Sequence, residues 1–337
     1  MMPAFTSSLF ILALPLVALA APHSDILRRH PNNATIHNAS LETRATTYKL
    51  KDHYTGKDFL RDWDFFSAGD PTHGAVNYLT KDEATKKGLA YVQKDGTTVL
   101  AVDSKTKLGA GQNRDSVRIS SPNSYTFGLF IADIFAMPHG PSVWPAYWTV
   151  GPNWPNGGEI DILEGVGDST TNQMTLHTSS DCSLDSSVAS QFSGKHTSHL
   201  SCASKNGDND GCGITDFSTH AYGHNFNMIA GGVYAHTVAA SGIKIWYFPR
   251  TAIPADITAK KPNPANWGQP TAFWASSTCD ISTHFKDHVL TFDTTLCGDW
   301  AGNAFPGGMS ACNKVVQNPA NYDLAQWKLN YVSVYTS

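Results

Sequence analysis

The sequence has little charge, and after residue 20 it has no long apolar run. Of its 337 residues 15% are charged, and the 24 basic and 28 acidic side chains leave a formal net charge of −4 at pH 7. A weakly acidic chain disfavours nucleic acid and anionic membranes, because both are negatively charged. A membrane-spanning helix needs roughly 20 apolar residues. We therefore expect neither nucleic acid nor a membrane among the partners.

Several common catalytic motifs are also missing. The sequence has no Gly-x-Ser-x-Gly nucleophile turn, no phosphate-binding loop and no dinucleotide fingerprint. It has no Cys-x-x-Cys pair, and closely spaced histidines such as His284 and His288 lack the glutamate of a zinc-protease helix. We interpret these histidines as surface residues and expect no cofactor and no catalytic metal.

The first 45 residues differ from the rest of the chain. Residues 1–20 carry no charge, are apolar over their second half and end on Ala-Leu-Ala, which is typical of a secretory signal peptide. Residues 21–45 are polar, have no apolar period and contain both glycosylation sequons, at Asn33 and Asn38. We interpret them as a propeptide or flexible leader. We expect a secreted, extracellular protein whose folded domain covers residues 46–337.

All six cysteines lie in the second half of the chain, in two groups of three. Secretion makes disulfides the default expectation. Two groups of three cannot pair wholly within themselves, so if all six are bonded, an odd number of bridges joins the groups. Parity does not choose among the remaining arrangements. The groups are Cys182, Cys202 and Cys212, then Cys279, Cys297 and Cys312.

Short segments rich in β-branched and aromatic residues recur along the chain, with few amphipathic helices between them. They are bounded by Gly, Pro, Asn or Asp, which predicts an all-β domain. In the last segment a strict alternation places Leu329 and Tyr331 on one face and Val332 and Val334 on the other, as in a strand of a two-sheet sandwich. The segments are 116–119, 126–135, 173–178, 242–248, 289–292 and 328–335.

Three carboxylates lie within six residues, at Glu159, Asp161 and Glu164, between glycine residues. In a helix, Asp161 and Glu164 would lie about 200° and about 140° around the axis from Glu159, so the three would share no face. In a strand, Glu159 and Asp161 share a face, and Glu164 joins them only if a β-bulge near Ile162 and Leu163 absorbs one residue. We predict a bulged strand.

Paired carboxyl groups suit glycoside hydrolysis. In the bulged strand, the Cα atoms of Glu159 and Glu164 would be about 13 Å apart, and their side chains can close this to about 5 Å, the separation of a retaining enzyme. One Glu would attack the sugar C1, the other would protonate the leaving oxygen, and Asp161 would couple to the nucleophile. Neighbouring negative charges raise one another's pKa, which keeps the acid protonated.

The same acids are compatible with a plain solvated face of a strand. The sequence context favours the catalytic interpretation, because a solvated face does not require two glycines before it. It also does not require Trp144, Trp148 and Trp154 shortly upstream. Tryptophans stack on sugar rings, although each one alone suits a buried core position at least as well.

Six segments together resemble glycoside hydrolase family 16, in particular its secreted fungal endo-1,3(4)-β-glucanases. The resemblance implies a β-jelly-roll of two antiparallel sheets with a concave substrate cleft. It also implies retaining endo-hydrolysis of β-1,3 and mixed β-1,3/1,4 glucans, with Glu159 as nucleophile, Glu164 as acid/base and Asp161 as the assisting carboxylate. The six-residue spacing of the acids is the laminarinase-like form. The segments are 144–148, 158–165, 176–178, 231–235, 245–250 and 296–302.

The resemblance also suggests substrate-binding residues. It places His177 near the nucleophile, although Leu-His-Thr equally suits a buried core histidine. One departure from the family is His236-Thr237-Val238, where many relatives have Met-Glu-Trp, and we expect it to alter a cleft rim or subsite. The tryptophans expected to contact sugar are Trp144, Trp148, Trp154 and Trp300.

Two other functions use the same residues differently. A cell-wall glucan transglycosylase needs the same carboxylates and an acceptor site. A non-catalytic glucan-binding jelly roll keeps the tryptophans but has no use for both Glu159 and Glu164. In all three cases the expected partner is a β-glucan polysaccharide, and we expect a monomer.

Overall fold

The computed structural model describes residues 47–205 and 207–337. The predicted signal peptide, the leader and its two sequons lie outside these residues and stay predictions. Within the described residues, no helix combines the length and the apolar character needed to cross a bilayer.

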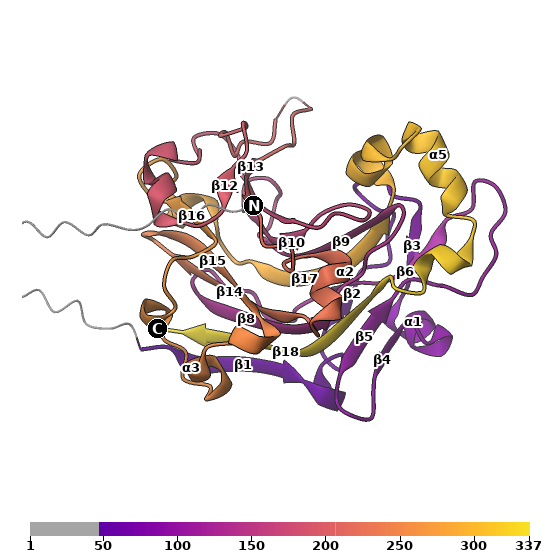
Figure 1. The fold of residues 1–337 in the computed structure, drawn as a ribbon, viewed down its shortest axis with the longest axis horizontal. Helices are drawn as coiled ribbons and strands as arrows, with labels where there is room; N and C mark the ends of the chain where they lie inside the picture. The colour runs from indigo at the N-terminus through magenta and orange to yellow at the C-terminus, as the bar shows by residue number, and fades with distance from the viewer. Residues whose placement is uncertain (1–46, 206) are drawn as a thin grey trace, which may run out of the picture. The chain divides into compact units, whose positions relative to one another are not determined.

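Two large sheets, each with eight strands paired antiparallel, form the domain. Figure 1 shows them as two stacked layers. The first sheet has the order β16 (Ala272–Ala275), β15 (Gly242–Pro249), β14 (Gly232–Ala239), β8 (Gly128–Ala136), β18 (Gln326–Thr336), β5 (Thr98–Ala101) and β4 (Ala90–Val92), with β1 (Lys49–Thr55) also on β18. The second has the order β12 (Lys195–His196), β13 (Cys212–Asp216), β11 (Asn172–His177), β10 (Glu159–Glu164), β9 (Val143–Val150), β17 (Val289–Leu296), β7 (Arg118–Ser120) and β2 (Asp64–Phe65).

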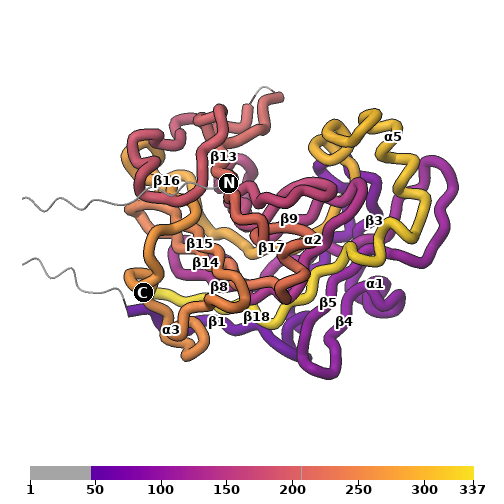
Figure 2. Tube along the Cα trace, in the orientation of Figure 1, coloured from indigo at the N-terminus to yellow at the C-terminus, as the bar shows by residue number. Residues whose placement is uncertain are grey.

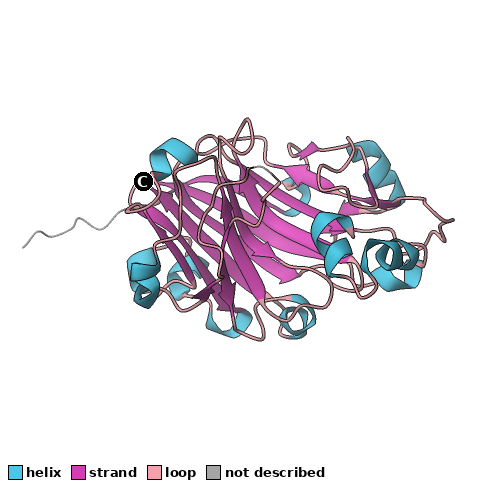
Figure 3. Ribbon diagram, turned by 90° about the horizontal axis from the view of Figure 1, so that it is seen from above, coloured by secondary structure: helices cyan, strands magenta, loops and turns pink. Residues whose placement is uncertain are grey.

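Helices are short and lie around the strands, as the view in Figure 3 shows. The sequence signals for α1 are complete, because Thr80 and Glu83 form a capping box and Gly88 ends the helix with φ +69°. The α-helices are α1 (Lys81–Lys87), α2 (Gly223–Met228), α3 (Ala255–Thr258), α4 (Ile281–His284) and α5 (Gly308–Val315). The prediction of an all-β sandwich with few helices is confirmed.

The main core lies between the two sheets. It is built by the inward residues of each alternating strand, such as Ile160 and Leu176 from the second sheet and Tyr234 and Val332 from the first. A second core joins α5 to the small parallel sheet of β3 (Val76–Tyr78) and β6 (Arg114–Ser116). In Figure 2, α5 lies beside β3.

The predicted alternation in the last strand is wrong at one point. The register between β18 and β8 shifts twice, once between Lys328 and Leu329 and once between Leu329 and Tyr331. Leu329 therefore packs in the main core together with Val332 and Val334, whereas Tyr331 packs on a different cluster. The extra residue, Asn330, donates a hydrogen bond of 2.8 Å to Asp133. A bulge adds one residue and so reverses the alternation.

All six cysteines are bonded. One bridge, Cys182–Cys279, joins the two groups, and each group closes one further bridge internally. The parity prediction is confirmed. The internal bridges are Cys202–Cys212 and Cys297–Cys312.

The expectation that His236 lies at a cleft rim is wrong. His236 is fully buried on β14, facing the main core, where its ring stacks on Phe130 with the centroids 4.6 Å apart. Neither ring nitrogen has a hydrogen-bond partner among the described residues. Burial lowers the pKa of His236 to about 3, so the ring is neutral.

Candidate active site

The predicted bulge is present in β10. On β9, Trp148 pairs with Asp161 and the next residue, Tyr147, pairs with Leu163, so Ile162 is the extra residue. Ile162 and Leu163 are both fully buried in the core between the sheets. Two successive residues therefore point inward, and Glu164 returns to the face of Glu159 and Asp161.

Two glycines and a buried histidine shape the entry to β10. Gly158 has φ +78°, and a Cβ there would lie 2.4 Å from the backbone oxygen of His284. Only glycine fits this conformation and this close approach. His288 bonds the Gly157 carbonyl with Nε2 and the Thr149 hydroxyl with Nδ1, each at 2.8 Å. The interpretation of His284 and His288 as surface residues is wrong, because their exposed fractions are 6% and 5%.

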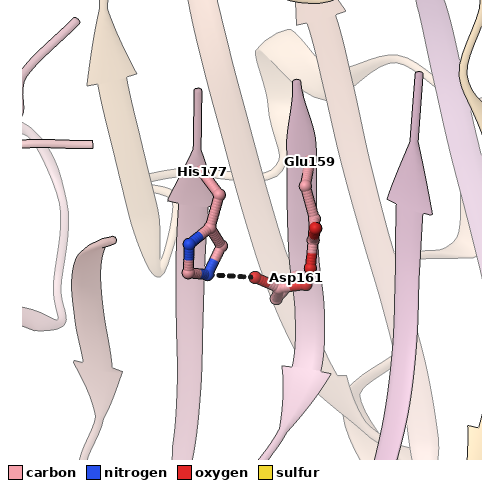
Figure 4. Close-up of side chains that lie close together, drawn as sticks. All are labelled: Glu159, Asp161 and His177. Carbon is pink, nitrogen blue, oxygen red and sulfur yellow. Dashed lines mark ion pairs between the residues drawn. The ribbon is translucent and has the colours of Figure 1, made fainter. Parts of the chain in front are cut away.

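Glu159, Asp161 and His177 lie together on the outer face of the second sheet. Glu159 pairs with His177 in the register between β10 and β11. His177 Nε2 lies 3.4 Å from Asp161 Oδ2 (Figure 4). The other ring nitrogen of His177 lies 3.1 Å from the Ser204 hydroxyl. Asp161 is 1% exposed and His177 is 8% exposed. His177 therefore contacts the carboxylates and is not part of the sandwich core.

Burial dominates the protonation of these acids. Burial, and then the charge of Asp161, raises the pKa of Glu159 to about 8. Burial also raises the pKa of Asp161 to about 7. Burial and the Asp161 charge hold the pKa of Glu164 well above its usual range. Glu164 is thus the group best suited to keep a proton and donate it.

Two tryptophan indoles donate hydrogen bonds to the two glutamates. Trp144 Nε1 donates to Glu164 Oε1 at 2.8 Å, and Trp154 Nε1 donates to Glu159 Oε2. Trp300 packs edge-on against Trp144, with the ring centroids 5.7 Å apart. Trp300 lies in the short π-helix Gly298–Gly302, which directly follows the cysteine of the Cys297–Cys312 bridge.

This arrangement of acids on a two-sheet fold has a counterpart among known families. A family model described as an XgeA-like, catalytic GH16 domain matches residues 63–335. The chain belongs to glycoside hydrolase family 16. Its two stacked antiparallel sheets are the β-jelly-roll seen in solved laminarinases of family 16.

Relatives and solved structures agree with the family 16 assignment. The chain is 40% identical over 317 residues to a probable endo-1,3(4)-β-glucanase of Aspergillus clavatus, covering 90% of this chain and 48% of that protein. The chain thus spans about half the length of that relative. It is 39% identical to GH16 Laminarinase 16A from Phanerochaete chrysosporium, solved with two β-glucans in donor and acceptor sites, with a TM-score of 0.81. That match covers 86% of this chain and 100% of the solved one.

A second solved structure has a different described activity. It is an elongating GH family 16 β-1,3-glucosyltransferase, 39% identical, with a TM-score of 0.81, and the match covers 86% of this chain and all of that chain. Family 16 membership therefore shows that the chain belongs to a family that cleaves glycosidic bonds. It leaves open whether water or a sugar hydroxyl accepts the cleaved glycosyl group.

The family 16 site also contains residues that the sequence did not single out. Asp293 on β17 is 7% exposed and lies 3.9 Å from Arg118 on β7. Burial, opposed by Arg118, raises the pKa of Asp293 to about 7. Arg118 also lies over the Trp148 ring, 4.8 Å from its centroid, and Trp148 is only 9% exposed. The signal for Asp293 is the alternation of Thr291, Asp293 and Thr295 along one strand face.

Two clusters of carboxylate and histidine side chains in the described residues have ligand atoms spaced as in a metal site. One is Glu159, Asp161 and His177, and the other is the loop group His199, Asp208 and Asp210. Acidic groups at such spacing are common without an ion.

Proposed function

We propose that this family 16 domain is a retaining endo-hydrolase of β-1,3 and mixed β-1,3/1,4 glucans. The observation that carries the proposal is the bulge, because it brings Glu164 to the same face as Glu159 and Asp161. Two glutamates on one face, with an aspartate between them, suit the short carboxyl separation of a retaining glycosidase. The names of the similar fungal proteins support the substrate class.

In the first step, ionised Glu159 attacks C1 of the sugar while Glu164 gives its proton to the leaving glycosidic oxygen. The C1–O bond to the leaving chain breaks as an ester bond forms between C1 and Glu159. The raised pKa of Glu164 favours the protonated acid that this step requires.

In the second step, Glu164 takes a proton from water, which attacks C1 and releases Glu159. Two inversions at C1 restore the original configuration. Asp161 lies between Glu159 and His177, so its charge and the histidine contact hold the nucleophile in place and tune its pKa.

The tryptophans extend this site toward the polysaccharide. Trp154 is 46% exposed and donates to Glu159, so its free ring surface is available for stacking on a sugar. We assign glucan binding to all four predicted tryptophans and to His177. The four are Trp144, Trp148, Trp154 and Trp300. The signal-peptide pattern of residues 1–20 supports secretion to the extracellular space. The proposed partner is a β-glucan, and the proposed enzyme acts as a monomer.

A second candidate is transglycosylation, which one solved relative supports by its described activity. It shares the first step and replaces water with a sugar hydroxyl in the second. The third candidate, a non-catalytic glucan-binding domain, leaves Glu159 and Glu164 without a role.

Product analysis separates these three functions. Laminarin and barley mixed-linkage glucan are incubated with the protein, with and without added laminari-oligosaccharide acceptors. We expect internal cleavage of both glucans, with β-anomeric reducing ends in the first products. Products that contain the added oligosaccharide extended by glucose units, and that are absent without it, would favour transglycosylation. Binding without cleavage would favour the non-catalytic function.

A further inference from the structure

A side chain occupies the gap that the bulge makes between β10 and β11. Asp161 pairs with Thr175 and Glu164 pairs with Gln173, so a step of three residues on β10 faces a step of two on β11. Such a step interrupts the ladder, and its backbone groups need other partners.

Asn172, the first residue of β11, supplies these partners. Its Nδ2 donates to the Ile162 carbonyl and its Oδ1 accepts from the Glu164 N–H, both at 2.8 Å. Asn172 is fully buried. The pairing needs one donor and one acceptor at adjacent atoms, which an amide provides, whereas a carboxylate lacks the donor and leucine lacks both.

We propose that Asn172 is a positioning residue that holds the bulge and thereby aims Glu164 at the glycosidic oxygen. This inference rests on the proposed role of Glu164 as general acid/base. Glu164 is then fixed at two points, its backbone N–H by Asn172 and its carboxyl by Trp144. Without the amide, the bulge can relax by one residue, and a slip of one residue turns a strand side chain to the other face.

If Asn172 positions Glu164, the rate loss caused by changing Asn172 should depend on the leaving group of the substrate. A sugar leaving group needs the proton from Glu164, whereas an activated aryl leaving group departs without it. Asn172→Leu keeps the branching at Cγ, although leucine is larger, and removes both hydrogen bonds. We expect it to lower kcat on laminarin by about a hundredfold, the effect of an error of about 1 Å, with a small change in KM. On an activated aryl β-glycoside of laminaribiose the comparison uses kcat/KM, which reports the first step alone, because hydrolysis of the intermediate needs Glu164 as base with either substrate. We expect this kcat/KM to fall by less than about tenfold.

The chain offers a matched control in Asn227 on α2. Asn227 also makes a pair of hydrogen bonds to the backbone. It accepts one from the Met137 N–H at 2.8 Å and donates one to the Met137 carbonyl at 2.9 Å. Asn227→Leu should lower the unfolding midpoint in urea, as Asn172→Leu does, and should leave the ratio of rates on the two substrates unchanged. Equal losses on both substrates for Asn172→Leu would overturn the positioning role.

Glu164→Gln separates this inference from the function on which it rests. If Glu164 is the acid, Glu164→Gln shows the same dependence on the leaving group. If Glu164→Gln shows it and Asn172→Leu does not, Asn172 is not a positioning residue. If Glu164→Gln does not show it, the assignment of Glu164 itself fails. Should Asn172→Leu not fold, Asn172→Asp is used, because it keeps the acceptor for Glu164 and loses only the bond to the Ile162 carbonyl. The same leaving-group dependence is then expected in weaker form, and its absence would overturn the positioning role.

Discussion

At the scale of single residues, the protonation of Glu159 depends on three neighbours. Burial and the charge of Asp161 raise its pKa, whereas His177 and the indole of Trp154 lower it. In the proposed mechanism Glu159 attacks as the anion, so the acidic side of the pH profile follows this pKa. Removing one neighbour at a time moves the profile in a direction that the structure fixes.

Asp161→Asn should move the acidic limb of kcat/KM to lower pH. The variant removes the negative charge that raises the pKa of Glu159, so the nucleophile stays ionised at lower pH. We expect a rate loss of at least about tenfold as well, because the variant disturbs the nucleophile. The profile on laminarin from pH 3 to 9 is the measurement, and an unmoved acidic limb would show that Asp161 does not tune Glu159.

Trp154→Phe should move the same limb in the opposite direction. Phenylalanine keeps an aromatic surface for the sugar but cannot donate a hydrogen bond to Glu159, so the pKa of Glu159 rises. As the pH falls, activity then begins to drop at a higher pH than in the wild type. Trp246→Phe is the control, because Trp246 lies on β15 of the other sheet. A shift to lower pH in Trp154→Phe would contradict the contact.

At the scale of elements, the sequence predicted one bulge and missed another. Glu159 and Glu164 cannot share a strand face without an extra residue, so the chemistry required the bulge in β10. The bulge beside Leu329 interrupts a perfect alternation, and only the pairing with β8 reveals it. Side-chain contacts from distant strands, such as Arg118 with Asp293, also depend on pairing that local sequence does not encode.

Gly158→Ala should destabilise the entry to β10. The left-handed backbone costs a non-glycine residue about 1–2 kcal/mol, and the added Cβ would lie 2.4 Å from the His284 carbonyl oxygen. We expect the free energy of unfolding to fall by more than about 3 kcal/mol. Gly88→Ala is the control: it has φ +69° but no atom within 4 Å of the added Cβ. Urea unfolding gives both values, and equal losses would show that the crowding at Gly158 is unimportant.

At the scale of the whole molecule, two buried features depend on how distant segments of the chain meet: a disulfide bridge and a histidine in the core. The Cys182–Cys279 bridge closes a separation of 97 residues. Parity in the sequence required such a link, but the choice of partners depends on which Cα atoms the fold brings within reach. His236 stacks on Phe130 in the core. The departure from the family pattern at residues 236–238 predicts a change at the cleft, but a single sequence does not show which strand face meets the other sheet.

His236→Met should make the protein more resistant to acid. The folded-state pKa of His236 is lowered to about 3, whereas an unfolded histidine has a pKa of about 6.5. Below pH 6.5 the unfolded chain therefore binds the proton more readily, and stability falls by up to about 1.4 kcal/mol per pH unit until the folded pKa is reached. Methionine does not titrate, so the stability difference between variant and wild type should widen from pH 7 to pH 4. Urea unfolding at each pH measures it, and a constant difference would refute the prediction.

The most direct test of the central claim is the configuration of rescued products. Glu159→Ala and Glu164→Ala are each given azide and an activated aryl β-glucoside, and the glycosyl azides are identified by NMR. If Glu159 is the nucleophile, azide replaces it in one displacement, and Glu159→Ala yields the α-azide. Glu164→Ala keeps the nucleophile, so azide attacks the covalent intermediate and yields the β-azide. The reverse pattern would exchange the two roles, and failure of azide to rescue either variant would contradict the retaining mechanism.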